Sequence, residues 1–134
     1  MSENEAIIPP QTMMIIYVAD QKRSAAFYRS VLGTEPLLDV LGMTEFAISR
    51  DLLLGIMPEE SIVRLLGDSV PHPGKGNGIP RCELYLPVVD PEFSYERLIQ
   101  QGGKGISPPE KRSWGHIVAY GVDPDGHVLA FAKK

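Results

Sequence analysis

Cysteine, positive charge and long apolar runs are all scarce in this sequence. The single cysteine, Cys82, excludes an internal disulfide, fits a reducing cytoplasm and is expected to be a small core residue of a strand. No run of about 18 apolar residues exists, and the first residues lack the positive region and apolar run of a signal peptide. We therefore expect a soluble, cytoplasmic protein that does not enter a membrane.

The charge balance argues against nucleic acid as a partner. Lys and Arg number 13 against 17 Asp and Glu, which gives a formal net charge of -4. The basic clusters are limited to Lys111-Arg112 and Lys133-Lys134, whereas proteins that bind DNA or RNA neutralise several phosphates with a basic surface. With 134 residues the chain suits one compact domain that needs neither a disulfide nor a structural metal for stability.

The first part of the chain alternates apolar runs with helix signals. Met13 to Val18 is an apolar run of strand length, and Asp20 follows as a helix N-cap candidate. The helix is expected to run to about Leu32 and to stop at Gly33. Three short strands are predicted after it, at Leu37–Val40, Thr44–Ser49 and Leu52–Met57. The predicted order is therefore β-α-β-β-β.

Residues 59–80 differ in character because proline and glycine crowd them, and we interpret them as a connector. Apolar periodicity in this segment is limited to Ile62 to Leu66. Its Gly74 to Gly78 stretch lacks the longer glycine spacing, the Lys followed by Ser or Thr, and the following helix of a phosphate-binding loop. A mobile loop is the favoured interpretation of that stretch.

The second part repeats the first. Glu83 to Val89 is a predicted strand, and Asp90 is an N-cap with proline at the first helical position, 70 residues after Asp20. The helix stops at Gly102-Gly103, and a proline-rich turn at 107–109 leads to a closing hairpin. The chain thus divides into module one (11–58), the connector (59–80) and module two (81–134).

The closing hairpin is centred on the turn Asp123 to Gly126. A four-residue loop would place Val122 opposite His127, and hence Ala119 opposite Ala130. On this register the alanine face leaves room for another group, while the bulky face packs on the helices. The bulky face consists of Val118, Tyr120, Leu129 and Phe131.

Several short motifs carry a family resemblance across nearly the whole chain. Module one has Val18-Ala19-Asp20, Phe27-Tyr28 and Val31-Leu32-Gly33; module two has Val89-Asp90, Ser107-Pro108-Pro109, Trp114-Gly115 and Asp123-Pro124-Asp125-Gly126. With the duplicated β-α-β-β-β order, the chain resembles the vicinal oxygen chelate superfamily of glyoxalase I, fosfomycin and bleomycin resistance proteins and extradiol dioxygenases. The resemblance implies an α+β fold, in which two βαβββ modules with curved mixed sheets enclose a cleft.

The resemblance also implies four metal-ligand positions, and this chain does not fill them. In metal-dependent members, His and Glu side chains from fixed strand positions hold a divalent ion in the cleft. The corresponding positions here are Met13, Glu83, Ala130 and a place within Leu53 to Ile56. One carboxylate makes no tight site for a divalent cation, so we predict that the usual metal cofactor is absent. The histidines are not expected to replace it, because His72 lies in the connector, and His116 and His127 fall on the face of the hairpin that points away from Ala130 on the predicted register.

Side-chain alternation predicts the lining of the cleft. Counting from the ligand-equivalent positions, the strand residues that point inward are Met13, Ile15, Tyr17, Glu83, Tyr85 and Pro87, and the last hairpin adds Ala119, Ala130 and Ala132. An apolar, aromatic-edged pocket with one acidic group suits a small molecule. Trp114, at the lip of the hairpin, either stacks on a flat or cationic ligand or serves as a hydrophobic plug.

Three functions are compatible with these residues. The first is a homodimeric, metal-free binding domain of the bleomycin-resistance type that holds an aromatic or cationic small molecule. The second is a lyase or isomerase of the glyoxalase kind with Glu83 as acid-base catalyst. The third, a metal-dependent dioxygenase or lyase, needs donors that this chain does not show. A structural alternative for Glu83 is an ion pair with Arg81 or Arg112.

Overall fold

The first half of the described chain forms one helix and a four-stranded sheet. The computed structural model describes residues 12–134, so the N-terminal segment 1–11, with the first residue of module one, lies outside the described residues. The elements are β1 (Thr12–Val18), α1 (Gln21–Leu32), β2 (Leu38–Val40), β3 (Met43–Ser49) and β4 (Leu52–Pro58). The sheet order is β1-β4-β3-β2, with β1 parallel to β4 and the other pairs antiparallel. The predicted elements are confirmed.

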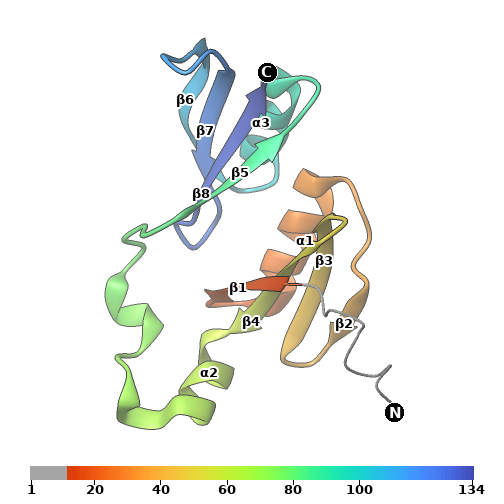
Figure 1. The fold of residues 1–134 in the computed structure, drawn as a ribbon. Coiled ribbons are helices and arrows are strands. Elements are labelled where there is room, and N and C mark those ends of the chain that lie inside the picture. The colour runs from red at the N-terminus through yellow and green to blue at the C-terminus, as the bar shows by residue number, and fades with distance from the viewer. Residues whose placement is uncertain (1–11) are drawn as a thin grey trace, which may run out of the picture.

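The second half repeats this arrangement, so the predicted α+β duplication is also confirmed (Figure 1). Its elements are β5 (Glu83–Pro87), α3 (Pro91–Gln100), β6 (Lys104–Lys111), β7 (Ile117–Val122) and β8 (Val128–Lys133). The order β5-β8-β7-β6 again pairs the first strand of the module in parallel with the last. We call the two sheets the first sheet and the second sheet.

Both main helices begin at the predicted aspartates. The Asp20 carboxylate accepts the backbone N–H of Arg23 at 3.0 Å, and the Asp90 carboxylate accepts that of Phe93 at 3.2 Å. These bonds satisfy N–H groups that the first helical turn leaves without partners. Gly33 ends α1 in the left-handed conformation, with φ of 70°. No helix in residues 12–134 is both long and apolar enough to span a membrane.

Strand β6 corrects the prediction of a proline-rich turn at 107–109. Pro108 and Pro109 lie within this strand, which is the edge of the second sheet. Its pairing with β7 shifts register between Gly105 and Ser107 and again between Ser107 and Glu110. An edge strand with bulges tolerates proline, because the missing N–H is not needed for a ladder bond there. The turn signal therefore marks a break in pairing, and the strand continues.

The connector contains more structure than its composition suggests. Helix α2 (Glu59–Leu66) includes the apolar residues Ile62 to Leu66. Two short 3-10 helices follow, η2 (Gly67–Ser69) and η3 (Pro73–Gly76). The connector runs around one side of the molecule in Figure 1. A Cβ placed on Gly126 would lie 2.8 Å from the carbonyl oxygen of Gly78, so the stretch predicted to be a mobile loop passes directly against the closing turn.

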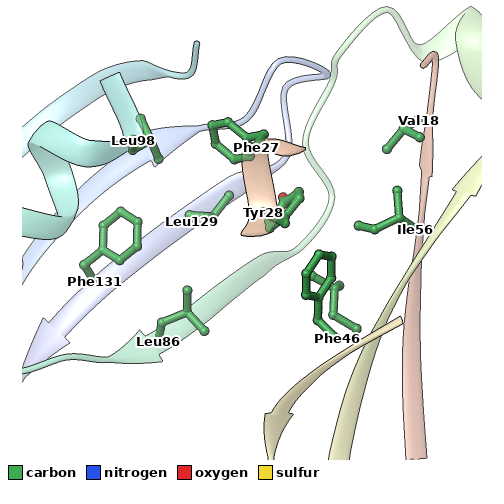
Figure 2. Close-up of a cluster of buried hydrophobic side chains, with 10 residues drawn as sticks. Val18, Phe27, Tyr28, Phe46, Ile56, Leu86, Leu98, Leu129 and Phe131 are labelled. Carbon is green, nitrogen blue, oxygen red and sulfur yellow. The ribbon is translucent and has the colours of Figure 1, made fainter. Parts of the chain in front are cut away.

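One hydrophobic core joins the two modules. Figure 2 shows side chains from both modules facing one another in the space between them. Module one contributes Val18, Phe27, Tyr28, Phe46, Leu54 and Ile56, and module two contributes Leu86, Leu98, Leu129 and Phe131. Cys82 was predicted to be a core residue of a strand, and that prediction is wrong. The residue precedes β5 and is exposed. Each sheet thus packs one face toward the core, and we call the opposite face its outer face.

The register of the closing hairpin differs by one residue from the prediction. Val122 pairs with Val128, so Ala130 lies opposite Tyr120 and Ala119 lies opposite Phe131. The reason is that the loop is one residue longer than predicted. Gly126 donates its N–H to the Asp123 carbonyl to close a turn, and with a φ of 96° it leads into one further loop residue, His127, before β8. Ala119 was therefore wrongly predicted to share a face with Ala130, because it shares the core face with Phe131.

Candidate functional site

The outer face of the first sheet is covered by thioether and aliphatic side chains. Gly55 of β4 pairs with Ile15 of β1. A Cβ on Gly55 would lie 2.9 Å from Met13 Sδ, 3.0 Å from Ile15 Cγ1 and 3.2 Å from Met43 Sδ. The predicted residues Met13 and Ile15 therefore do share a face, and they fill the space above the glycine. Tyr17, two residues further along β1, is 36% exposed.

The outer face of the second sheet carries the polar and aromatic residues of the prediction. Tyr85 of β5 and Tyr120 of β7 both pair with Ala130 of β8, which lies between them. Glu83 is exposed, and its carboxylate forms no hydrogen bond or ion pair with any residue between 12 and 134. The Arg112 guanidinium instead donates to the Val118 carbonyl at 2.8 Å. The expected ion pair of Glu83 with an arginine is not formed within the described chain.

Trp114, Tyr85 and His116 form a chain of hydrogen bonds on this outer face. The Trp114 indole N–H donates to the Tyr85 hydroxyl at 2.9 Å, and that hydroxyl lies 2.8 Å from His116 Nδ1. The Tyr85 hydroxyl thus accepts from Trp114 and shares a second hydrogen bond with His116, whose direction follows the tautomer of the His116 ring. His116 was predicted to face away from Ala130. That prediction is wrong, because its partner Tyr85 lies on the Ala130 face.

The loop that carries Trp114 is held by its backbone and by one arginine. Arg112 donates its backbone N–H to the His116 carbonyl at 2.8 Å, and Gly115 donates to the Arg112 carbonyl at 3.0 Å. The Arg112 guanidinium also donates to Ser107 Oγ at 2.9 Å and lies 5.2 Å from the centroid of the Tyr120 ring. Gly115 takes a φ of 98°, which side chains disfavour. The loop is therefore a defined turn.

Charge on this face acts on Tyr120. Burial raises the pKa of its phenol, and the negative charge of Glu83 raises it further, while the positive charge of Arg112 opposes both. The charges of Glu83 and Arg112 therefore both act on Tyr120 on the outer face of the second sheet. The sequence prediction included Glu83 but omitted Tyr120, because the register error turned Tyr120 toward the helices.

The alanines of the second sheet are not open to solvent in this structure. Ala130 is 0% exposed and Ala132 is 3% exposed, although both point away from the main core. With Val118, also 0% exposed, they form a separate small cluster against which Tyr120 packs. The predicted room above the alanine face is therefore occupied by larger side chains of the protein itself.

The aspartates of the closing turn fasten the two modules together, a role that the sequence did not reveal. Asp125 accepts the backbone N–H of Ala19 at 3.0 Å and the guanidinium of Arg23 at 3.2 Å, both next to the start of α1. Asp123 accepts the hydroxyl of Tyr28 at 2.6 Å. The turn itself accounts for the presence of Asp123 and Gly126. The carboxylate of Asp125 is not needed for the turn, and it was the sequence signal that could have indicated a distant contact.

Asp123 is also paired with His127. The two side chains lie 2.8 Å apart, from Oδ2 to Nδ1, and Asp123 is 3% exposed. Burial favours a neutral carboxyl, but the hydrogen bond and charge of His127 hold the pKa of Asp123 below its usual value. Burial likewise disfavours the imidazolium, yet the Asp123 hydrogen bond and charge raise the pKa of His127. The same carboxylate raises the pKa of Tyr28, for which burial is the largest cause.

The residues at the ligand-equivalent positions do not fit a divalent ion. Met13 offers a thioether, Ala130 a methyl group, and Gly55 lies where module one would supply a donor. Glu83 is the one oxygen donor of this set. Among residues 12–134, no three His, Cys, Asp or Glu side chains gather in a way that could hold a metal ion. The absence of the metal cofactor remains a prediction.

The predicted site residues form two groups within one chain. Met13 and Ile15 lie on the outer face of the first sheet, and Glu83, Tyr85 and Ala130 lie on that of the second. The sheets do not close around a common cleft. A cavity of about 890 Å³ lies between the connector, the end of β1 and the closing turn, and it is lined by Ile15 and Tyr17 of the prediction together with Glu59 and His127.

Comparison with known proteins identifies the fold. A family model described as the Glyoxalase/Bleomycin resistance protein/Dioxygenase superfamily matches residues 10–131. No curated protein matches significantly. Similar crystal structures include a glyoxalase-related enzyme from Fulvimarina pelagi, 21% identical over 95% of this chain and 89% of that chain with a TM-score of 0.79. Another is a glyoxalase/bleomycin resistance protein/dioxygenase family enzyme from Burkholderia phytofirmans, 17% identical over 93% of this chain and 98% of that chain with a TM-score of 0.72. At these identities the similarity shows a shared fold.

Proposed function

Because this chain belongs to the Glyoxalase/Bleomycin resistance protein/Dioxygenase superfamily, we propose that it binds an aromatic or cationic small molecule without a divalent metal. The observation that carries the proposal is Glu83. Its carboxylate has no partner among residues 12–134 and lies beside Tyr85 on a face where no three His, Cys, Asp or Glu side chains of these residues gather to hold a metal ion. A carboxylate next to aromatic rings suits a cation or a polarised ring. We place the protein in the cytoplasm, in keeping with its single exposed cysteine.

A second copy of the chain would complete the binding cleft. The outer faces of the two sheets point away from the core that joins them. The outer face of the first sheet in one chain would therefore oppose that of the second sheet in its partner, which brings Met13 and Ile15 opposite Glu83 and Tyr85. Exposed Ile15 and Tyr17, each at 36%, favour such a cover. Light scattering should give the mass of a homodimer, and a concentration-independent monomer would contradict the arrangement.

A lyase or isomerase of the glyoxalase type is the second candidate. The hydrogen-bonded Tyr85 and His116 next to Glu83 favour it, because an acid-base carboxylate and a phenol could move a proton and stabilise an oxyanion. Without a metal ion the oxyanion has few stabilisers, so turnover would be slow. A metal-dependent dioxygenase is disfavoured by the donor set at Met13, Gly55 and Ala130.

A thermal-shift screen would test the binding proposal. Planar aromatic cations and α-oxo thiol adducts should be screened together, and a stabilising compound should lose most of its effect on Glu83→Gln, which keeps shape and removes charge. Glu60→Gln is the matched control, because Glu60 is an exposed carboxylate on α2. Equal affinity of the wild type and Glu83→Gln would make Glu83 structural. Turnover of an adduct by the wild type, lost in Glu83→Gln, would favour the enzyme.

A further inference from the structure

The hydrogen-bonded chain of Trp114, Tyr85 and His116 spans the second sheet above its smallest side chains. We propose that it is a latch over an apolar binding hollow floored by Val118, Ala130 and Ala132. The latch opens when a flat aromatic group bearing a hydrogen-bond acceptor displaces the Trp114 indole. For the choice of ligand this inference rests on the proposed function, whereas the latch itself does not.

The floor of the hollow is unusual in being both outward-facing and buried. Val118 pairs with Ala132, and Ala130 lies two residues earlier on the same face of β8. All three are at most 3% exposed. Methyl and isopropyl groups on an outer face cannot exclude water from themselves, so larger side chains must cover them. Tyr120 packs against the cluster, yet it stands on one side of the floor alone.

The topology shows what covers the rest. The sheet order is β5-β8-β7-β6, so Tyr85 on β5 and the loop between β6 and β7 lie on opposite sides of β8. That loop lies at the end of the sheet where Ile117 pairs with Lys133, next to the pair of Val118 and Ala132. Hydrogen bonds from this loop to Tyr85 must therefore cross above β7 and β8. The bonds of Trp114 and His116 to Tyr85 make that crossing.

The cover is held by contacts that a ligand can replace. Trp114 is 52% exposed and Tyr85 is 38% exposed, and their mutual bond joins two neutral groups near water. Such bonds contribute little net stability, because water satisfies the separated groups. The loop backbone is anchored independently through Arg112 and His116. The indole can thus swing outward while its loop keeps its shape.

The chemistry of the hollow selects the ligand group. The floor has no polar side-chain atom, so it favours an apolar ring. When the Trp114 N–H leaves the Tyr85 hydroxyl, an oxygen or nitrogen acceptor at the edge of the ring takes the place of water as its partner. Tyr85 keeps its bond to His116 throughout, which holds its ring upright as one wall of the opened hollow.

Trp114 is the sole tryptophan, so its fluorescence reports the latch directly. Tyr85→Phe keeps the ring and removes both hydrogen bonds. We expect acrylamide quenching of Trp114 to rise by roughly half, since local opening exposes the remainder of an indole that is already 52% exposed. Binding of 1-anilinonaphthalene-8-sulfonate, whose flat naphthalene ring bears a sulfonate acceptor, should rise as well. Tyr95→Phe is the control, because Tyr95 is a tyrosine on α3 that belongs to neither outer face.

The outcomes separate the two proposals. Unchanged quenching and probe binding in Tyr85→Phe, or equal changes in Tyr95→Phe, would overturn the latch even if a ligand depends on Glu83. Increased quenching and probe binding in Tyr85→Phe alone would support the latch even if the thermal-shift screen finds no ligand. His116→Phe leaves the bond of Trp114 to Tyr85, so a smaller change is expected there. All variants should be compared at equal oligomeric state and with near-ultraviolet circular dichroism of the folded protein.

Discussion

The carboxylate of Asp125 lies 3.2 Å from the guanidinium of Arg23, across 102 positions of sequence. The same carboxylate accepts the backbone N–H of Ala19, just before α1. The side chain of Asp125 is 11% exposed, so water screens these contacts less than it screens a surface ion pair. The turn that closes the second module therefore also fastens the helix of the first.

Replacing Asp125 should weaken the whole domain. Asp125→Ala removes the contacts to Ala19 and Arg23, and we expect the free energy of unfolding to fall by about 1–3 kcal/mol, as for other charged hydrogen bonds. Urea denaturation measures the loss. Glu35→Ala is the control, since its pair with Arg29 is exposed on both sides and should contribute less than about 1 kcal/mol. Equal losses in the two variants would mean that Asp125 acts as an ordinary surface charge.

Stability should depend on pH through Asp123 and His127. Because the pKa of His127 is raised in the folded protein, its contribution is complete below the unfolded value of about 6.5 and is lost as pH rises through the folded pKa. Because the pKa of Asp123 is lowered, its contribution is present above about 3.9 and is lost as pH falls through the folded pKa. The urea midpoint should therefore be highest between these limits.

His127→Gln tests which residue causes the alkaline decline. It removes the titrating imidazole, so the urea midpoint should no longer fall as pH rises above about 6.5. The acid decline should become smaller, because His127 also lowers the pKa of Asp123. His72→Gln is a suitable control, because His72 accepts the N–H of Gly74 within the connector and belongs to neither module. A persistent alkaline decline in His127→Gln would assign it to another group.

Divalent metals should leave thermal stability unchanged. Met13, Gly55, Glu83 and Ala130 offer one oxygen donor among them, so Ni²⁺, Zn²⁺, Mn²⁺ and Fe²⁺ should bind only weakly. Thermal denaturation with micromolar ion, compared with added chelator, provides the measurement. A stabilisation of several degrees by any of these ions would contradict the predicted absence of a metal cofactor.

Gly103 is expected to tolerate no side chain. A Cβ there would lie 2.6 Å from the Val122 carbonyl oxygen and 2.8 Å from Leu98 Cδ2. Gly103→Ala should therefore reduce the free energy of unfolding by roughly 1–3 kcal/mol, the range of an overpacked site. Gly76→Ala is the matched control, because a Cβ at that residue would meet no heavy atom within 4 Å, and its effect should be small. Similar urea midpoints for both variants would show that β6 can shift to make room.

Local signals in the sequence were sufficient for most of the fold. Asp20 and Asp90 cap their helices as predicted, since an N-cap needs only its own side chain and the next turn of backbone. Strand β6 was missed because proline indicates a turn unless the strand is known to be an edge. Sheet order is a tertiary property, so the residues of β6 alone could not reveal it.

The candidate site was predicted less completely, because it depends on register and on long-range contacts. Parity within β1 and β5 correctly grouped Met13 with Ile15 and Glu83 with Tyr85. One extra loop residue after Asp123 exchanged the two faces of β7 relative to β8, so Ala119 was wrongly assigned to the site face and Tyr120 was omitted from it. The cover over Ala130 comes from a loop and a strand far apart in sequence, and no local pattern encodes such a contact.

The attachment of α1 to the closing turn has a consequence for synthesis. A chain made from its N-terminus exposes Ala19, Arg23 and Tyr28 long before Asp123 and Asp125 leave the ribosome. The apolar face of α1 also lacks its core partners Leu129 and Phe131 until the last strand has been made. The nascent first half is therefore expected to keep apolar surface exposed and to remain incompletely ordered through most of translation. The domain can complete its core only once the closing hairpin has emerged.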